Sequence, residues 1–235
     1  MGVQLFILVA LLASLQLGRT EDFHPDRTLL MDVYPRDRPT NFLFRGNMPV
    51  INGSFAYSEI VMTMRGVAGK FNYTLPANFT LIDVSYLNIF EESDLEIERK
   101  FFESNPELGK LENRVIIGSF LPPPQEDPDL IKDIIREYID ISYDKLPELM
   151  TYFHSLLMLP SPTVIYSHCE AGTDRTGEVS GAYYMRYLNM TFSDALYIDN
   201  HVQSRDMYKT SRNGMQWYCF YLKFVEDFSH LDCVV

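Results

Sequence analysis

Residues 163–185 read Thr163-Val-Ile-Tyr-Ser-His-Cys169-Glu-Ala-Gly-Thr-Asp-Arg175-Thr-Gly-Glu-Val-Ser-Gly-Ala-Tyr-Tyr-Met185. A short β-branched run ends at Cys169, an arginine follows at Arg175, and a segment with helical character begins directly afterwards. The pattern predicts a strand, a tight loop and the N-terminus of a helix. A thiol and a guanidinium then lie at opposite ends of the loop.

Such a loop has the chemistry to bind a phosphate group. Backbone N–H groups that lead into a helix N-terminus bind anions, and the planar fork of Arg175 matches two phosphate oxygens. Cys169 is expected at the floor of this cradle, where the helix dipole and the guanidinium favour the thiolate. Gly172 provides the backbone freedom that a tight turn needs. A thiolate below a bound phosphate monoester can attack phosphorus and form a phosphocysteine.

The combination His-Cys-x2-Gly-x-x-Arg-Thr, between a β-run and a helix, resembles the cysteine-based protein tyrosine phosphatase superfamily on its dual-specificity side. The resemblance covers roughly residues 163–190, and 44–49 (Phe-Arg-Gly-Asn-Met-Pro) resembles the short entry motif of many dual-specificity domains. It implies that Cys169 is the nucleophile and that His168 orients the loop and tunes the thiolate. It also implies that Thr176 bonds the sulfur or assists water attack, although helix capping is an equal alternative. The expected phosphate-binding residues are Glu170, Ala171, Gly172, Thr173, Asp174 and Arg175.

The Asp174-Arg175-Thr176 ending is also similar to myotubularin-like and bacterial lipid and tyrosine phosphatases, in which the loop aspartate is implicated in catalysis. Thr173 stands where the bacterial members carry lysine, and this weakens the case for a polyanionic lipid headgroup. The expected activity is therefore phosphate monoester hydrolysis, with a phosphoprotein, phosphotyrosine or a small phosphomonoester as substrate. A phosphoinositide phosphatase and a silent pseudophosphatase that binds phosphorylated ligands remain alternatives.

The leaving oxygen needs a general acid, and two aspartates compete for this role. Asp140 precedes Cys169 by 29 residues, which is close to the usual position in the superfamily, whereas Asp174 lies within the loop. Asp140 is slightly favoured. Asp144, Asp127 and Asp129 fit less well, because Asp144 can start a helix and Asp127-Pro128 resembles a helix N-cap followed by proline.

The N-terminus predicts export. Residues 1–18 have the length and apolar character of a signal peptide, with an uncleaved signal anchor as the alternative. Four N-glycosylation sequons begin at Asn52, Asn72, Asn78 and Asn189. The expected location is outside the cell or in the lumen of the secretory pathway.

Three cysteines in an oxidising compartment leave one thiol unpaired. A bridge between Cys219 and Cys233 leaves Cys169 free as a nucleophile. It requires the chain after a helix at 214–228 to turn back, so the pairing stays open at this stage. The five histidines show no metal-ligand spacing, and neither a metal nor a cofactor is expected.

Net charge is −12, from 20 basic and 32 acidic residues. An acidic surface argues against nucleic acid and against an anionic membrane, apart from the possible signal anchor.

Strand and helix patterns alternate along the chain, which predicts an α/β domain with a central, mostly parallel sheet flanked by helices. This domain is expected to span residues 40–235, after an extended segment at 19–39. The expected strands are 61–64, 80–87, 114–120 and 163–167, and the expected helices are 93–103, 129–138, 145–157, 177–188, 193–202 and 214–228.

Overall fold

A central five-stranded sheet organises the computed structural model, which describes residues 22–124, 128–160 and 162–234. The strand order is β1-β2-β7-β5-β6, with β1 antiparallel to β2 and the other neighbours parallel. The strands are β1 (Leu29–Tyr34), β2 (Asn41–Asn47), β5 (Thr80–Ser85), β6 (Gly109–Asn113) and β7 (Thr163–Cys169), and a separate two-stranded ribbon joins β3 (Val50–Ile51) to β4 (Ser54–Phe55). The predicted single α/β domain with a mostly parallel sheet is confirmed.

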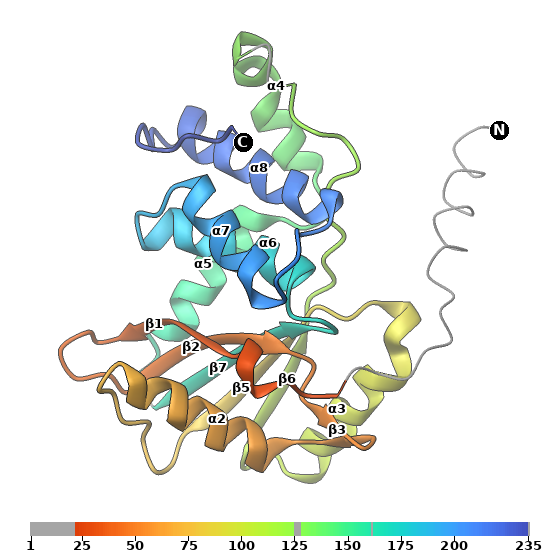
Figure 1. Ribbon diagram of the computed structural model, residues 1–235, viewed down its shortest axis with the longest axis vertical. Helices are drawn as coiled ribbons and strands as arrows, with labels where there is room; N and C mark the ends of the chain where they lie inside the picture. The colour runs from red at the N-terminus through yellow and green to blue at the C-terminus, as the bar shows by residue number, and fades with distance from the viewer. Residues whose placement is uncertain (1–21, 125–127, 161, 235) are drawn as a thin grey trace.

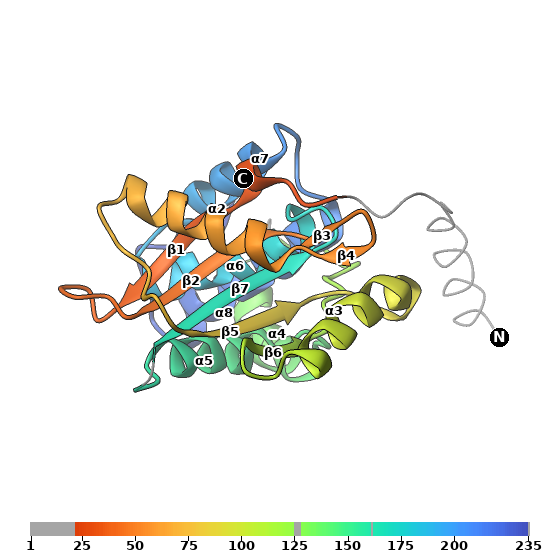
Figure 2. The ribbon, with the colours of Figure 1, turned by 90° about the horizontal axis from the view of Figure 1, so that it is seen from below.

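Helices cover both faces of the sheet (Figures 1 and 2). On one face lie α2 (Tyr57–Lys70) and α3 (Glu92–Ser104). The other face carries α5 (Leu146–Leu157), α6 (Asp174–Tyr187) and α7 (Phe192–Val202), with α8 (Lys209–Val225) packed on α6 and α4 (Pro128–Ile141) packed on α8. The described residues also form two short 3-10 helices, η1 (Pro25–Arg27) and η2 (Ile89–Glu91).

The middle strand β7 is buried along its whole length, as expected for a parallel strand covered on both faces. Side chains on a strand alternate between faces. Val164 and Tyr166 accordingly join the apolar cluster beneath α2, whereas Ile165 and Cys169 join the larger cluster beneath α5, α6 and α8. The nucleophile candidate therefore lies on the helix-rich side of the sheet.

Two predicted strands are wrong. Residues 61–64 belong to helix α2, where Ile60, Met64 and Val67 are buried at helical spacing and Met62 is exposed. Residues 114–120 form an irregular segment, because the strand that pairs with β5 is the preceding stretch, β6.

The predicted start of the domain at residue 40 is also wrong. The segment 19–39 contains β1, which pairs with β2 from Leu29 to Tyr34, so the boundary cuts through an antiparallel pair. Helix α6 begins at Asp174 rather than at 177, and α8 begins at Lys209 rather than at 214. The signal peptide predicted at 1–18 and the cap predicted at Asp127 lie outside the described residues.

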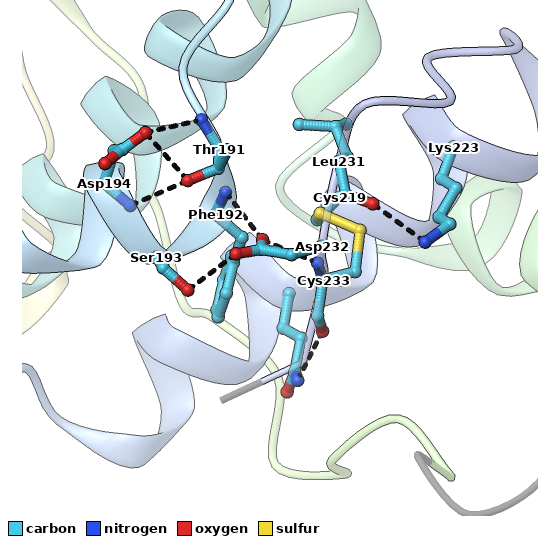
Figure 3. The surroundings of a disulfide bond; sticks show 10 residues. Thr191, Phe192, Ser193, Asp194, Cys219, Lys223, Leu231, Asp232 and Cys233 are labelled. Carbon is cyan, nitrogen blue, oxygen red and sulfur yellow. Dashed lines mark hydrogen bonds between the residues drawn. A yellow bond between two sulfur atoms is a disulfide. The ribbon is translucent and has the colours of Figure 1, made fainter.

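The C-terminal segment turns back along α8 and is held there covalently. A disulfide joins Cys219 to Cys233, with Cα atoms 5.5 Å apart, and Cys169 remains a free, buried thiol. Figure 3 shows Asp232 beside the bridge, where its carboxylate accepts hydrogen bonds from the Phe192 backbone N–H (3.0 Å) and the Ser193 hydroxyl (2.7 Å). The predicted pairing is thus present, and the chain makes the required turn after Val225.

All four sequon asparagines, Asn52, Asn72, Asn78 and Asn189, are exposed. Among the described residues, no helix is both long and apolar enough to cross a bilayer.

Candidate active site

Cys169 lies at the carboxyl end of the central strand, which is where open α/β sheets bind ligands. Its thiol is 1% exposed and helix α6 begins five residues later at Asp174. A cavity of about 990 Å³ opens above it and is also lined by Glu170, Ala171 and Arg175. The structure therefore brings together the thiol and the guanidinium that the sequence predicts.

Three consecutive carbonyl groups of the loop accept hydrogen bonds from donors outside it. The Glu170 oxygen accepts from the Met48 N–H (3.1 Å), the Ala171 oxygen from an Arg27 NH group (3.2 Å) and the Gly172 oxygen from Arg45 (2.6 Å). In a planar trans peptide, the N–H points away from the carbonyl. The N–H groups that follow these carbonyls are therefore turned toward the inside of the loop, as an anion cradle requires.

Gly172 has no room for a side chain. Its φ is +77°, and a Cβ there would lie 2.7 Å from the Gly46 carbonyl oxygen and 2.9 Å from the Asn47 nitrogen. Both the backbone conformation and the close approach of β2 thus require glycine at this position. The packing of the loop against the end of β2 is part of what shapes the cradle.

Arg45 on β2 belongs to the motif at 44–49, for which the sequence predicted no supporting role, and its side chain is fully buried. Besides Gly172, its guanidinium donates to the Ser180 hydroxyl (2.6 Å) on α6 and forms an ion pair with Asp199 on α7. One side chain therefore ties the phosphate loop to two helices. The available signal was an arginine directly after the apolar run 42–44, because a charge that continues a buried strand needs a buried partner.

The guanidinium of Arg175 is oriented by Glu91 at the end of η2. Two hydrogen bonds of 2.6 Å join the two groups in a bidentate pair, and Arg175 also donates to the Tyr86 carbonyl (3.0 Å). Glu91 is held in turn by a capping box with Asn88. This pairing fixes the plane of the Arg175 guanidinium at the edge of the cavity. No local sequence pattern indicated that Glu91 has this role.

His168 lies behind the nucleophile, fully buried between two carboxylates. Its Nε2 is 3.0 Å from Asp83 Oδ1 and 3.5 Å from Glu98 Oε1. Burial alone would lower the pKa of His168, but Glu98 and Asp83 outweigh it and raise this pKa to about 9. The imidazole is therefore held as a cation directly before Cys169 in the chain.

The same three side chains carry donor atoms of the kind that bind divalent metals, all within 4.8 Å of one another. In this structure the positive charge facing the two carboxylates is the imidazolium itself. Burial also raises the pKa of Glu98 to about 8, although His168 acts to lower it, so this cluster holds protons near neutral pH.

The structure separates the two candidate acids. Asp140 lies on the exposed side of α4, beside the buried Ile139, and it does not line the cavity. The preference for Asp140 is therefore wrong on position, because α4 continues through Ile141 and turns this carboxylate to solvent.

Asp174 lies in the first turn of α6 and lines the cavity. Its two oxygens accept from Arg205 (3.0 and 2.6 Å), and one also accepts from the Tyr208 N–H (2.7 Å). Among the described residues, Glu170 is the other carboxylate that lines the cavity. Asp129 is exposed near the start of α4, and Asp127 is not described.

Asp144 has a structural role beside the cavity and is not a candidate acid by position. It is mostly buried and accepts the backbone N–H groups of Ile117 (2.8 Å) and Gly118 (2.7 Å). Beneath it lies Glu178 of α6, whose pKa is raised well above its ordinary value by burial and by Asp144. Glu178 therefore favours its protonated form in the fold, and Asp144 anchors the irregular segment after β6.

The two loop threonines have different surroundings. Thr173 donates from its hydroxyl to the Gln203 side chain (2.8 Å), which links the loop to the segment between α7 and α8. Thr176 is fully buried, and its hydroxyl has no hydrogen-bond partner among the described residues. No side-chain cap bond forms at the start of α6, so helix capping by Thr176 is not observed.

No protein-family model matches the chain, and no curated protein matches it. Several solved phosphatase structures are similar to the chain over most of its length, at low sequence identity. A kinase associated phosphatase with serine in place of its catalytic cysteine is 12% identical, with a TM-score of 0.48 over 88% of this chain and 98% of that one. A mutant form of Tk-PTP is 14% identical, with a TM-score of 0.42 over 86% and 97%. Human DUSP28 is 15% identical, with a TM-score of 0.37 over 80% and 91%.

Proposed function

We propose that this protein is a cysteine-dependent phosphatase that hydrolyses phosphate monoesters through a phosphocysteine intermediate. The observation that carries the proposal is the set of three outward-turned carbonyls around a buried thiol. They leave the backbone N–H groups of the loop directed at the space above Cys169, with Arg175 at its edge. This arrangement suits three phosphate oxygens and places the sulfur below phosphorus.

The reaction has two displacement steps. The Cys169 thiolate attacks phosphorus while the bond from phosphorus to the ester oxygen breaks, and an acid protonates the leaving oxygen. The same group, now deprotonated, accepts a proton from the water that attacks the phosphocysteine. The bond from phosphorus to sulfur breaks, and phosphate leaves with the thiolate restored. The buried hydroxyl of Thr176 follows Arg175 in the chain and forms no hydrogen bond to any described residue, so its proposed contact with the sulfur forms only during turnover.

Asp174 is the proposed acid, because Asp140 is remote and Asp174 lines the cavity. Arg205 holds both of its oxygens, so proton donation requires this contact to loosen when substrate enters. Loss of the acid should slow a phosphate ester with a poor leaving group by about 10²–10⁴-fold and leave an activated aryl ester much less affected.

The test compares Asp174→Asn with Glu170→Gln on a pair of esters, one activated aryl phosphate and one alkyl phosphate. A selective loss on the alkyl ester for Asp174→Asn supports the assignment. Equal losses on both esters would assign Asp174 a structural role, and a selective loss for Glu170→Gln would move the acid to that residue. Cys169→Ser should abolish turnover of both esters. Unchanged turnover in that variant would contradict the proposed cysteine-dependent mechanism.

We further propose that the enzyme works outside the cytosol. Four exposed sequon asparagines and a disulfide that spans 14 residues both suit an oxidising, glycosylating compartment. Secretion from cultured eukaryotic cells, followed by a mass shift on glycosidase treatment, is the expected result. A cytosolic, unglycosylated product would contradict it.

A further inference from the structure

Exposed apolar side chains gather around the mouth of the cavity. Sixteen large hydrophobic side chains are exposed in the described residues, and six of them line this one cavity. They come from η2, the segment after β6, the turn before α5 and the start of α8: Ile89, Phe90, Ile117, Phe120, Tyr143 and Tyr208. We call these six residues the apolar collar. A concentration of this kind on an otherwise acidic surface marks a binding surface.

The backbone beneath the collar is anchored at several points. Ile89 and Phe90 follow Asn88, which forms the capping box with Glu91. The N–H groups of residues 117 and 118 are held by Asp144, and that of Tyr208 by Asp174. A surface held in this way loses little conformational freedom when a ligand covers it.

The charges beside the collar decide what kind of ligand it suits. Both arginines that line the cavity are already paired, Arg175 with Glu91 and Arg205 with Asp174. Glu170 adds a third carboxylate to this region, and the whole chain has a net charge of −12. Acidic groups next to the phosphate of a substrate would therefore meet carboxylates. Each arginine in the cavity already has an acidic partner and is not free to pair with them.

We propose that the apolar collar binds large apolar side chains that flank a phosphotyrosine in an extended protein segment, and that it selects against acidic flanks. This specificity rests on the proposed phosphatase function. Apolar side chains from these four segments can enclose residues on both sides of a phosphotyrosine whose phosphate reaches Cys169. An anionic bilayer is disfavoured as the source of the phosphate, because the carboxylates at the mouth and the net charge repel it.

The test uses two phosphotyrosine peptides of equal length, one with Leu and Phe on both sides of the phosphotyrosine and one with Asp and Glu. The ratio of their kcat/KM values should favour the apolar peptide at least tenfold in the wild type. The double variant Ile89→Ser/Phe120→Ser should reduce this ratio about tenfold. These two side chains are 77% and 70% exposed, so their replacement removes little from the core.

Met62→Ser is the matched control, because Met62 is also 70% exposed but lies on α2, on the opposite side of the sheet. It should leave the peptide ratio unchanged. A preference for the acidic peptide, a ratio that the double variant does not change, or faster turnover of a phospholipid monoester in anionic vesicles would overturn the proposal.

Turnover of a small aryl phosphate separates the specificity from the phosphatase function. If this ester is not hydrolysed, the phosphatase proposal fails, and the collar is then tested by binding. Fluorescence polarisation of the two labelled peptides on Cys169→Ser protein should again favour the apolar peptide, and equal affinities would reject the collar.

Discussion

Arg45 shows at the scale of one residue how the candidate site is supported. Its guanidinium is 0% exposed and joins Gly172 of the loop to Ser180 and Asp199. Arg45→Ala leaves Asp199 as a buried charge without its partner, which typically costs about 3–5 kcal/mol. We expect a large loss of stability together with loss of phosphate binding, measured by urea unfolding and vanadate titration.

Arg99→Ala is the control for this prediction. Arg99 also contacts two carboxylates, Glu92 and Glu96, but these pairs lie on the surface of α3 and contribute at most about 1 kcal/mol. If the two variants lose equal stability, the role assigned to the buried arginine is wrong.

The residues between Thr163 and Arg175 could be predicted from sequence because strand, loop and helix signals coincide there. The partners of those residues could not. Glu91 and Glu98 pair with Arg175 and His168, and Asp199 pairs with Arg45, which supports the loop. All three acids reach the site only through tertiary folding, and each looks like an ordinary surface acid in its own segment. The choice of Asp140 failed for the same reason, since counting residues back from Cys169 does not show which side of α4 faces the site.

The disulfide tests the account at the scale of one element. Cys219 lies within α8 and Cys233 in the segment that returns along it, 14 residues later. A loop of this length stabilises the folded state by about 3 kcal/mol in the entropic view. Cys233→Ser should therefore lower the urea midpoint, and reductant should lower the midpoint of the wild type to a similar value.

The response to reductant is the internal control, because the variant has no bridge left to lose. Its urea midpoint should be the same with and without reductant. A wild type that is insensitive to reductant would show that the bridge does not stabilise the domain.

Helix α2 explains why a strand was predicted wrongly at residues 61–64. Val61, Met62 and Thr63 suit a strand by local propensity, but the buried residues Ile60, Met64 and Val67 follow helical spacing over a longer stretch. The segment 114–120 is similar, because the N–H groups of Ile117 and Gly118 bond to Asp144 instead of to a neighbouring strand. In both cases, packing across the molecule outweighed the local preference.

At the scale of the whole molecule, buried titratable groups predict how stability depends on pH. Burial raises the pKa of Glu98 and of Glu178 above 4.5, while Glu98 and Asp83 raise that of His168 from 6.5 to about 9. In each case the folded protein holds the proton more tightly than the unfolded chain. Each group's contribution to stability is therefore fully present below its pKa in the unfolded chain and is lost as pH rises through its pKa in the folded protein. The melting temperature should therefore fall between about pH 5 and pH 9.

Glu178→Gln removes one of these groups and should flatten this fall, because an amide beside Asp144 has no proton to lose. Glu103→Gln, on the exposed surface of α3, is the control and should leave the profile unchanged. A melting temperature that rises from pH 5 to pH 9 in the wild type would contradict the assignment of protonated buried carboxyls.

The central claim is that Cys169 becomes covalently phosphorylated during turnover. The most direct measurement mixes reduced protein with an aryl phosphate, quenches it in acid within milliseconds, and examines the peptide that contains Cys169 by mass spectrometry. The account predicts one phosphoryl group on Cys169, formed as fast as the first burst of aryl alcohol and absent in Cys169→Ser. Turnover with no phosphoryl group on this peptide, or a burst that survives in Cys169→Ser, would contradict it.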